Sequence, residues 1–509
     1  MSRKLRRPSS VASTPRVRAL WICPELAPFT SSHLSEEISS LARCLRAADV
    51  EPTLIVPCWK EIKPGDLNIA KRLVQAEVKF PSKTLTADVW EGRLSGGVRV
   101  FFLEHPELFA PFHSQEKSTN DPGKWAFLTR AAFDLAEKLS LQPEVIHSHG
   151  WQPALAPYLL QKQKTLTAKS LVTIYDIREQ GAYPKAWVDT LGIGWDGFHL
   201  GGFEFYDQLS FLKAGIAYAD YLSTTSPNYT KEILVSGAGG LEGLLGYRGE
   251  RLRGINHGID YEHWNPENDL SIAQPYSTQD FGGRRRCKAE LQRTFRLPVR
   301  EGRPVLSFIA KTTPKSGIED MLKSLEQIVA MGFQVVCSLE GDDAALRDAT
   351  IQLAHQRPDA VGVSLDNNER LQRKILAGSD FFAFPDAYAP SAAPLMRAMR
   401  YGAVPIARAT GNVLDLVEEA TPTSGNGFLF NSEAGSLMEA IQRAHRAYSE
   451  SRSFREVQQR AMTRDVSLQT TAAQYRDLYY TMLNREIPAT KAEEFASSGF
   501  VEKLANNAK

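Results

Sequence analysis

Residues 374–412 constrain the fold more than any other stretch of the sequence, because they contain a strand, a loop, a helix and a second strand. The run 380–385 has the length of a buried strand, and 394–401 carries apolar residues at helical spacing. Proline at the start of this helix and Gly402 after its end both suit a helix boundary. Residues 404–407 then return to the sheet. This pattern predicts one β-α-β unit of a parallel sheet.

The turn between this first strand and the helix, residues 386–393, is the predicted location of the functional site. It follows the carboxyl end of a strand, and open parallel α/β sheets bind their ligands at that edge. The turn contains Ala389, Pro390 and Ser391 in the sequence DAYAPSAA. We therefore expect chemistry, if the chain performs any, to involve this turn.

Further units of the same kind occur in both halves of the chain. Apolar runs of strand length stand at 19–23, 52–56, 145–148 and 171–174 in the first half, and at 305–309 and 334–339 in the second. The helix between the first two runs has an apolar face formed by Ile38, Leu41 and Leu45. No internal repeat of solenoid length is present. The sequence predicts an α/β protein with two doubly wound domains.

Composition narrows the function classes. With 509 residues, 43% of them hydrophobic, the chain is long enough for two or three domains. A net charge of +1 gives no electrostatic footprint for nucleic acid. The five cysteines are scattered without CxxC spacing, which favours a reducing compartment and disfavours a zinc site. No apolar run is long enough for a membrane helix, so we expect a cytoplasmic protein without membrane or nucleic-acid partners.

The first eighteen residues, MSRKLRRPSSVASTPRVR, are rich in Arg, Lys, Ser and Pro and contain no acidic residue. This composition is typical of an organelle transit peptide. A short disordered bacterial tail has the same composition. Both interpretations stay open.

Several segments together resemble the family of bacterial glycogen synthases and plant starch synthases. They are PELAPF at 24–29, the long segment FYDQLSFLKAGIAYADYLSTTSPNYTKEIL at 205–234, and AGSDFFAFPDAYAPSAAPLMRAMRYGAVPIARATGN at 377–412. The resemblance covers roughly residues 17–483. It implies the GT-B arrangement, in which two doubly wound, Rossmann-like domains face one cleft.

The resemblance also implies a division of the chain. We expect a disordered basic tail at 1–17, an N-terminal starch-synthase-like catalytic domain at 18–270, a linker at 271–300, a C-terminal glycosyltransferase-like nucleotide-sugar domain at 301–466, a C-terminal helix packing on the N-terminal domain at 467–484, and a tail at 485–509.

In this family, the loop after the first strand carries a lysine and paired glycines that bind the donor diphosphate and glucose. This chain has Ser31 at the lysine position, and His33 and Leu34 at the glycine positions. Paired glycines let backbone amides approach a phosphate without interference from a Cβ atom. His33 and Leu34 are therefore expected to obstruct that approach.

The same kind of change recurs at the other binding and catalytic positions that the resemblance implies. Lys311 replaces an arginine and so loses the planar, bidentate fork. Ala389 replaces the glutamate of a Glu-Pro-Cys-Gly-Leu motif, and Tyr175 replaces a histidine that touches the donor glucose. The remaining altered positions are Gly150, His257, Ser316, Asn367 and Ala392. No catalytic position of the family is expected to be intact.

Some residues remain candidates for binding a nucleotide sugar. They are Lys311, Lys315, His149, Trp151, Tyr175, Asp176, Thr410 and Gly411. The family needs no metal or other cofactor, and none is expected here. The carboxylates of Glu36, Glu37, Asp176 and Asp386 are possible replacements for a lost acid or base, but helix starts and turns commonly carry such residues.

An active family member transfers glucose from ADP-glucose to the non-reducing end of an α-1,4-glucan with retention of configuration. Because so many groups that would stabilise the departing diphosphate are changed, the sequence favours a catalytically degenerate, glycogen synthase-like pseudoenzyme of glycogen biosynthesis. Its role would be glucan binding, regulation or scaffolding, with α-glucan, a nucleotide sugar such as ADP-glucose, or an active glycogen synthase as partners.

Two other hypotheses stay open, so the sequence does not decide whether the chain is an enzyme. The first is an active retaining glucosyltransferase that uses ADP-glucose or another nucleotide sugar, with Lys311 and Lys315 at the phosphates and Tyr175 or Asp176 near the sugar. The second is a structural relic that binds neither glucan nor nucleotide.

Overall fold

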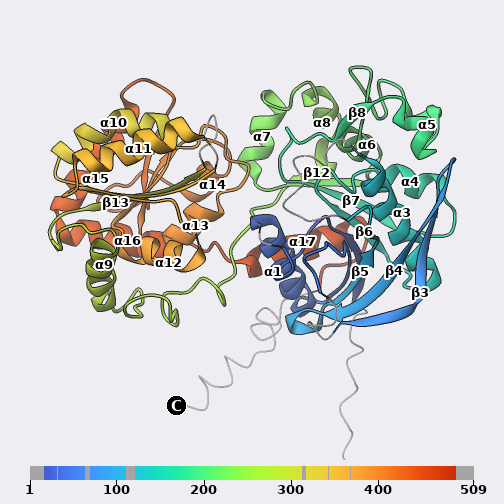
Figure 1. Cartoon of the computed structure of the whole chain (residues 1–509), viewed down its shortest axis with the longest axis horizontal. Helices are drawn as coiled ribbons and strands as arrows, with labels where there is room; N and C mark the ends of the chain where they lie inside the picture. Colours follow the sequence, from blue (N-terminus) through green and yellow to red (C-terminus); the bar gives the residue numbers. More distant parts are fainter. Residues whose placement is uncertain are drawn as a thin grey trace, which may run out of the picture.

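Two α/β units lie side by side in the computed structural model (Figure 1). The structure describes residues 16–30, 32–63, 69–109, 121–311, 317–341, 343–366 and 368–488. The first unit is built around one large sheet, and the second around a smaller, fully parallel sheet.

The first unit contains a nine-stranded sheet in the order β12-β11-β7-β6-β1-β2-β5-β4-β3. Neighbouring strands are parallel from β12 to β5, whereas β4 pairs antiparallel with both β5 and β3. The strands are β1 (Val17–Ile22), β2 (Val50–Pro57), β3 (Ala70–Lys79), β4 (Thr84–Arg93), β5 (Arg99–Glu104), β6 (Val145–His149), β7 (Lys169–Ile174), β11 (Tyr221–Thr224) and β12 (Leu252–Gly254).

Helices and a small second sheet surround this large sheet. The small sheet has the order β8-β10-β9, with β8 (Ala182–Pro184), β9 (Glu204–Phe205) and β10 (Gln208–Ser210). The helices are α1 (His33–Ala47), α3 (Gly123–Lys138), α4 (Ala156–Lys162), α5 (Trp187–Leu191), α6 (Phe211–Tyr218), α7 (Pro227–Val235) and α8 (Glu242–Arg248), with single 3-10 turns at Ser95–Gly97, Trp195–Gly197 and Gly249–Arg251.

Helix α1 forms where the sequence predicts it. Its N-cap, Ser32, accepts a hydrogen bond from the backbone N–H of Ser35, and the Ser35 side chain accepts one from the N–H of Ser32. Ile38, Leu41 and Leu45 are buried on one face of the helix against the sheet. The carboxyl end of β1 and the start of α1 are thereby fixed relative to each other.

The second unit contains a six-stranded parallel sheet in the order β15-β14-β13-β16-β17-β18. Its strands are β13 (Val305–Lys311), β14 (Gln334–Glu340), β15 (Val361–Ser364), β16 (Phe381–Phe384), β17 (Val404–Arg408) and β18 (Phe428–Phe430). Its helices are α9 (Gly282–Thr294), α10 (Ile318–Ala330), α11 (Ala344–Gln356), α12 (Glu369–Gly378), α13 (Ala393–Arg400), α14 (Val413–Leu416), α15 (Ser436–Ser449) and α16 (Ser451–Thr463).

Helices cover both faces of this second sheet. Phe381 packs with the residues of α10, α15 and α16, whereas the next residue, Phe382, packs with those of α13 on the opposite face. Successive side chains of a strand point to opposite faces, so the alternation identifies a doubly wound sheet. The predicted α/β fold with two doubly wound units is confirmed.

The expected linker, residues 271–300, contains helix α9. Leu291 of this helix and Phe295 after it are buried in a cluster with Ile375 of α12. Helix α9 is therefore packed onto the second sheet as part of that unit.

The last described helix, α17 (Leu468–Met482), returns to the first unit and lies beside α1 (Figure 1). Its residues Tyr475 and Tyr479 are buried in the core of the first unit. Just before α17, Ser467 forms an isolated β-bridge with Ile259, so the two chain crossings between the units run next to each other.

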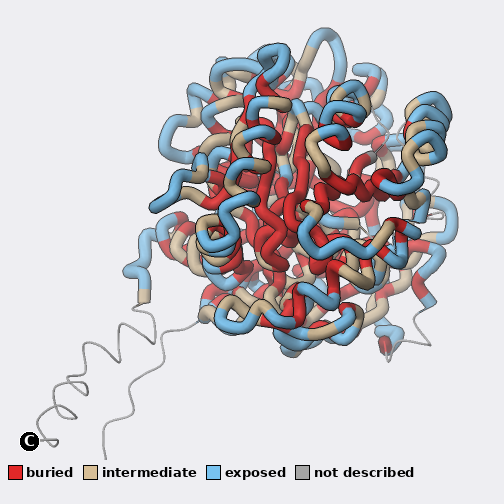
Figure 2. Tube along the Cα trace, turned by 90° about the vertical axis from the view of Figure 1, so that its left-hand side faces the viewer, coloured by how far each residue is buried: buried red, intermediate tan, exposed pale blue. Residues whose placement is uncertain are grey.

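The buried residues follow the strands at the centre of the molecule, and the exposed residues lie on the covering helices and loops (Figure 2). Within the described ranges, no helix is both long and apolar enough to cross a membrane. The same ranges contain no group of three His, Cys, Asp or Glu side chains placed to hold a metal ion.

Candidate functional site

The two sheets present their carboxyl ends to a cleft between the units. A cavity of about 630 Å³ lies there, which we call the cleft cavity. The first unit contributes Ser32, His33 and Glu36 from the start of α1. The second unit contributes residues at the carboxyl ends of β13, β14 and β16, residues of α12 and its N-cap, and residues of the 386–393 turn and of α13. These residues are Ile309, Ala310, Glu340, Asn368, Glu369, Gln372, Leu376, Phe384, Asp386, Tyr388, Ser391, Pro394 and Arg397, and Trp264 completes the wall.

The start of α1 presents side chains to this cavity. The side chain of Ser32 is engaged with the backbone of Ser35, and His33 lines the cavity wall. Leu34 packs against the core of the first unit. The structure therefore places His33 at the wall of the cleft, where a glycine would have left the backbone accessible.

Arg397 is the one Lys or Arg among the described residues that line the cleft cavity. Its Nη2 atom donates to Oε2 of Glu36 at 2.7 Å, so an ion pair joins α13 to α1 across the cleft. The guanidinium lies 4.1 Å from the ring centroid of Trp264. Sequence reasoning missed Arg397 because it lies within the apolar stripe of the helix that the sequence predicted correctly.

The carboxyl groups of the wall differ in their surroundings. Burial raises the pKa of Asp386 to about 7, against a smaller opposing effect of Arg408. Hydrogen bonds from His263 and Arg373 hold the pKa of Glu369 down to about 2. Glu369 is thus a paired carboxylate, whereas Asp386 forms no ion pair with any residue of the described ranges.

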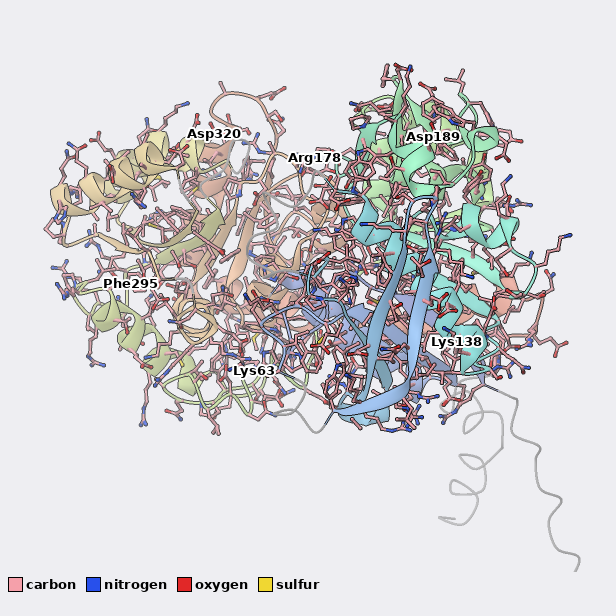
Figure 3. All side chains as sticks on the ribbon, turned by 45° about the vertical axis from the view of Figure 1, so that its right-hand side comes forward. Lys63, Lys138, Arg178, Asp189, Phe295 and Asp320 are labelled. Carbon is pink, nitrogen blue, oxygen red and sulfur yellow. The ribbon has the colours of Figure 1, made fainter. Side chains whose placement is uncertain are left out.

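The turn at 386–393 is packed onto the first unit. The hydroxyl of Tyr388 lies 2.6 Å from the Tyr229 hydroxyl and donates to Oδ1 of Asp176 at 2.7 Å. The guanidinium carbon of Arg178 is 3.5 Å from the centroid of the Tyr388 ring, and Figure 3 shows Arg178 at the junction of the two units. The Thr225 hydroxyl donates to the carbonyl of Pro390. Asp176, a predicted binding residue, is therefore engaged by protein groups.

Ala389 and Ala392 lie in this turn with almost no exposed surface, in an apolar cluster that includes Met396 and Val413. Neither methyl group can act as an acid, a base or a hydrogen-bond partner. The structure thus places these two residues in the cleft-facing turn, and it gives them a packing role.

Thr410 and Gly411 follow β17 next to the same turn. The backbone N–H of Gly411 donates to Oε2 of Glu232 on α7 at 2.8 Å. A Cβ atom at Gly411 would stand 2.7 Å from the carbonyl oxygen of Ala389, so this close approach requires glycine. The buried hydroxyl of Thr410 has no hydrogen-bond partner among the described residues.

His149 and Tyr175 contact each other within the first unit, where Nδ1 of His149 is 2.9 Å from the Tyr175 hydroxyl. Burial, with the nearby His257, holds the pKa of His149 well below its ordinary value. Burial also raises the pKa of Tyr175 well above its ordinary value. These two predicted binding residues are brought together but do not line the described part of the cleft cavity.

Trp151 and Gly150 follow β6. A Cβ atom at Gly181 would stand 2.1 Å from the Trp151 ring, so the ring lies directly over that glycine. Gly150 has φ +83°, a conformation that a larger residue adopts only with strain. The predicted candidate Trp151 is therefore held in a packed position.

His257 forms an interaction that sequence reasoning missed. Its Nδ1 atom pairs with Oε1 of Glu37, and its Nε2 atom lies 2.9 Å from the Tyr475 hydroxyl. The three residues come from α1, from the crossing between the units and from α17. No sequence pattern connects them, because they meet only through the return of the C-terminal helix.

Glu25 and Glu179 were also missed. Burial raises the pKa of Glu25 to about 7, with an opposing hydrogen bond from Ser32 and a smaller contribution from Glu179. Burial, together with Asp176, raises the pKa of Glu179. Both follow strands whose carboxyl ends meet at the cleft, which is the signal that could have identified them. Carboxyl groups with raised pKa are suited to proton transfer near neutral pH.

Of the five remaining positions, four are outside the described residues and one ends a strand. Ser31, Lys315, Ser316 and Asn367 are outside the described ranges. Lys311 is the last residue of β13.

The family model for the starch synthase catalytic domain matches residues 18–247. A glycogen synthase of Anaeromyxobacter dehalogenans is 33% identical over 480 residues, which cover 92% of this chain and 99% of that protein. A glycogen synthase of Myxococcus xanthus is 32% identical over 480 residues, covering 92% of this chain and all of that protein.

Solved structures give the same result for the fold. The catalytic domain of starch synthase IV from Arabidopsis thaliana, bound to ADP and acarbose, is similar with a TM-score of 0.84 and 24% identity, covering 92% of this chain and all of that domain. Sucrose-phosphate synthase from Thermosynechococcus elongatus is similar with a TM-score of 0.57 at 15% identity over 92% of this chain and all of that protein.

Proposed function

The chain belongs to the glycogen and starch synthase family of GT-B glycosyltransferases, and on that premise we propose that it has kept the fold and lost the transfer reaction. One observation carries the proposal. The single cation on the described wall of the cleft cavity, Arg397, is neutralised by Glu36 of the opposite unit. The function that we propose for the protein is to bind α-glucan, or an active synthase, in a regulatory or scaffolding role.

Glucosyl transfer from a nucleotide sugar requires positive groups around the departing diphosphate. Each preorganised partner of a developing charge contributes about 3–4 kcal/mol to the rate, which is a factor of 10²–10³. In a metal-free site, that charge must be met by Arg, Lys, backbone amides and helix N-termini. The described wall offers one arginine, already paired, and His33 beside the N-terminus of α1.

The docking of the 386–393 turn also supports this proposal. Tyr388 fills the space between α7 and the loop after β7 and makes hydrogen bonds to Tyr229 and Asp176. Ala389, which the family resemblance aligns with a glutamate of the donor site, is buried. The 386–393 turn is thus hydrogen-bonded to the opposite unit, and it has no ionisable side chain at position 389. Such a turn is suited to holding the two units together.

A binding role is supported by the relatives. Identity extends over the full length of bacterial glycogen synthases, and the structurally similar plant starch synthase domain binds acarbose. This chain has both domains of the family, which is the framework on which a glucan site would be built. We therefore propose α-glucan as the ligand of the folded protein.

A second candidate function is an active retaining glucosyltransferase that uses ADP-glucose or another nucleotide sugar. Full-length identity of 33% to glycogen synthases favours it, as do the raised pKa values of Glu25 and Glu179. In that case Lys311 and Lys315 would serve the phosphates, and Glu25 would take the role of an acid or base. Glu25→Gln is then expected to lower the rate at least about 100-fold.

The deciding experiment measures transfer of radiolabelled glucose from ADP-glucose, and in parallel UDP-glucose, to glycogen by the purified chain. An active bacterial glycogen synthase assayed under the same conditions is the positive control. We expect no transfer above background, together with co-sedimentation of the chain with glycogen. Transfer by the unmodified chain, abolished by Glu25→Gln, would establish the second candidate instead.

A further inference from the structure

Helix α9 and the residues that follow it carry a concentration of positive charge. Residues 281–303 contain eight basic and two acidic residues, a net formal charge of +6, whereas the whole chain carries +1. In Figure 1, α9 lies at the lower left of the second unit, on the side away from the first unit. This charge is therefore separate from the cleft between the units.

The inward-facing basic residues of α9 are buried and fully used by the fold. Arg284 donates to the backbone carbonyls of Tyr401 and Ser379. Nζ of Lys288 donates to Oδ2 of Asp380 at 2.7 Å. These contacts fix α9 on the second sheet, so the outward-facing residues of the helix stand on a rigid support.

The outward-facing arginines, in contrast, have little compensating negative charge. Arg286 and Arg293 are exposed and lie seven positions apart, which places them on one face of the helix about 10 Å apart along its axis. Neither forms an ion pair or a side-chain hydrogen bond with a described residue. Arg285 pairs with Glu301 at 2.9 Å, but these side chains are 78% and 68% exposed, so the pair contributes little to stability.

A groove of about 610 Å³ lies beside these arginines, between α9 and the segment before it. Its lining residues are Ala273, Arg285, Arg286, Ala289, Glu290 and Arg293. Glu290, its one acidic lining residue, accepts a hydrogen bond from Nζ of Lys374 on α12 at 2.7 Å and is neutralised by it. A Cβ atom at Gly283 would stand 2.3 Å from the carbonyl oxygen of Pro275, so the segment is packed closely onto the start of α9. The groove is thus preformed and positively charged.

The chemistry of the groove indicates its partner. Guanidinium groups bind carboxylates through two parallel N–H···O bonds. Exposed apolar side chains also occur here, because Leu270 precedes α9 and Val299 follows it. Arginine together with apolar side chains is typical of protein interfaces, whereas a nucleic-acid site needs a series of phosphate contacts along a strand. These features favour an acidic segment of a protein.

We propose that the outer face of α9 is a docking surface for a protein partner that presents an acidic segment, whose carboxylates bind Arg286 and Arg293. The two arginines are about two helical turns apart, so a partner helix with acidic residues seven positions apart matches their spacing. Arg285 exchanges Glu301 for a carboxylate of the partner. The inference goes beyond the proposed function, since it involves neither the cleft nor a glucan.

Fluorescence anisotropy of a labelled, alanine-based helical peptide with glutamates two turns apart, titrated with the full chain, tests this inference. We expect the peptide to bind at low salt and to weaken as salt is added, and the same peptide with glutamine in place of glutamate not to bind. Arg286→Gln/Arg293→Gln should weaken binding about tenfold, because it removes two charge-assisted contacts. Arg251→Gln/Arg253→Gln is the matched control, because it removes two exposed arginines of the first unit that also lack an ion pair among the described residues.

The same variants distinguish the other possible occupants of the groove. If labelled oligothymidylate binds more tightly than the peptide and is weakened by the α9 double variant, the partner is a nucleic acid and the proposal is wrong. If sedimentation shows self-association that the α9 double variant abolishes, the occupant is a second copy of the chain, which also overturns it. So does a glutamate peptide that does not bind, or one that binds the two double variants equally.

Discussion

At the residue scale, Asp386 is a largely buried carboxyl group in the wall of the cleft cavity. Burial raises its pKa to about 7, so between about pH 4 and 7 the folded chain binds more protons at this residue than the unfolded chain does. Stability from this group is therefore fully present at low pH and is lost as the pH rises through 7. Above that pH, folding carries the cost of an ionised, largely buried carboxylate.

Asp386→Asn removes this cost. We expect the variant to gain about 1–3 kcal/mol of stability relative to the unmodified chain at pH 8.5, and little or nothing at pH 4.5. Urea unfolding at the two pH values measures the difference. Asp348→Asn, which removes an exposed carboxylate on α11, is the control. An equal effect of Asp386→Asn at both pH values would contradict the assignment.

The site residues also show what a sequence can and cannot indicate at this scale. His33 was predicted to obstruct the loop after β1, and it lines the cleft cavity. Arg397 was not predicted, because a charged residue inside an apolar helical stripe has no sequence partner to identify it. Its partner Glu36 lies 361 positions earlier, so only the meeting of two domains creates the pair.

At the scale of elements, local patterns predicted the core of the second unit closely. The strand expected at 380–385 is β16 (Phe381–Phe384), and the helix expected at 394–401 is α13 (Ala393–Arg400). The bounds predicted for the linker, 271–300, include helix α9, because the stretch up to Arg286 is polar and contains glycine. The spacing of Cys287, Leu291 and Phe295 gives that helix its apolar face, but the surface that receives it, α12, is far away in sequence.

Helix α17 is held in the first unit by buried hydroxyl groups as well as by packing. The Tyr479 hydroxyl accepts a hydrogen bond from Nε1 of Trp21 at 2.9 Å and lies 2.8 Å from Nδ1 of His147. The pKa of His147 is held well below its ordinary value by burial, so its ring is neutral. The Tyr479 hydroxyl therefore satisfies two buried polar groups at once.

Tyr479→Phe leaves both of these groups without a partner. We expect it to lower the free energy of unfolding by about 2–3 kcal/mol, because an unsatisfied buried donor or acceptor retains its full desolvation cost. The neighbouring residue offers a matched control. Tyr480 is equally buried, but its hydroxyl has no hydrogen-bond partner among the described residues, so Tyr480→Phe should be nearly neutral. Equal losses in the two variants, measured by urea unfolding, would show that the hydroxyl bonds do not stabilise α17.

At the scale of the whole molecule, local patterns predicted two doubly wound units, whereas only the family resemblance implied that the units face one cleft. Periodicity and turn residues define each sheet, because both act over short distances. The contacts across the cleft come from loops and helix ends. Asp415 of α14 accepts from the side chain and backbone of Asn228, and Glu232 accepts from Gly411. Such contacts depend on the relative orientation of the units, which no local pattern encodes.

Tyr388 is the central contact of this closed arrangement, since it combines two hydrogen bonds with the stacked guanidinium of Arg178. Tyr388→Phe keeps the ring and should leave the units closed, with a stability loss of about 1 kcal/mol. Tyr388→Ala removes the ring as well. Among the described residues, the other links between the units are two chain crossings, the Glu36–Arg397 ion pair and polar contacts of α7 and Thr225. We therefore expect this variant to open the cleft.

Small-angle X-ray scattering measures that opening. A compact chain of this length has a radius of gyration of roughly 23 Å, and separating the two units at their crossings should raise it by roughly 1 Å. Tyr206→Ala, at an exposed tyrosine of the first unit, is the control for loss of an aromatic side chain. If Tyr388→Ala scatters like the unmodified chain, the cleft is held by the Glu36–Arg397 pair and the α7 contacts without Tyr388. If it opens and Tyr388→Phe does not, the packing of the ring beneath Arg178 holds the units together.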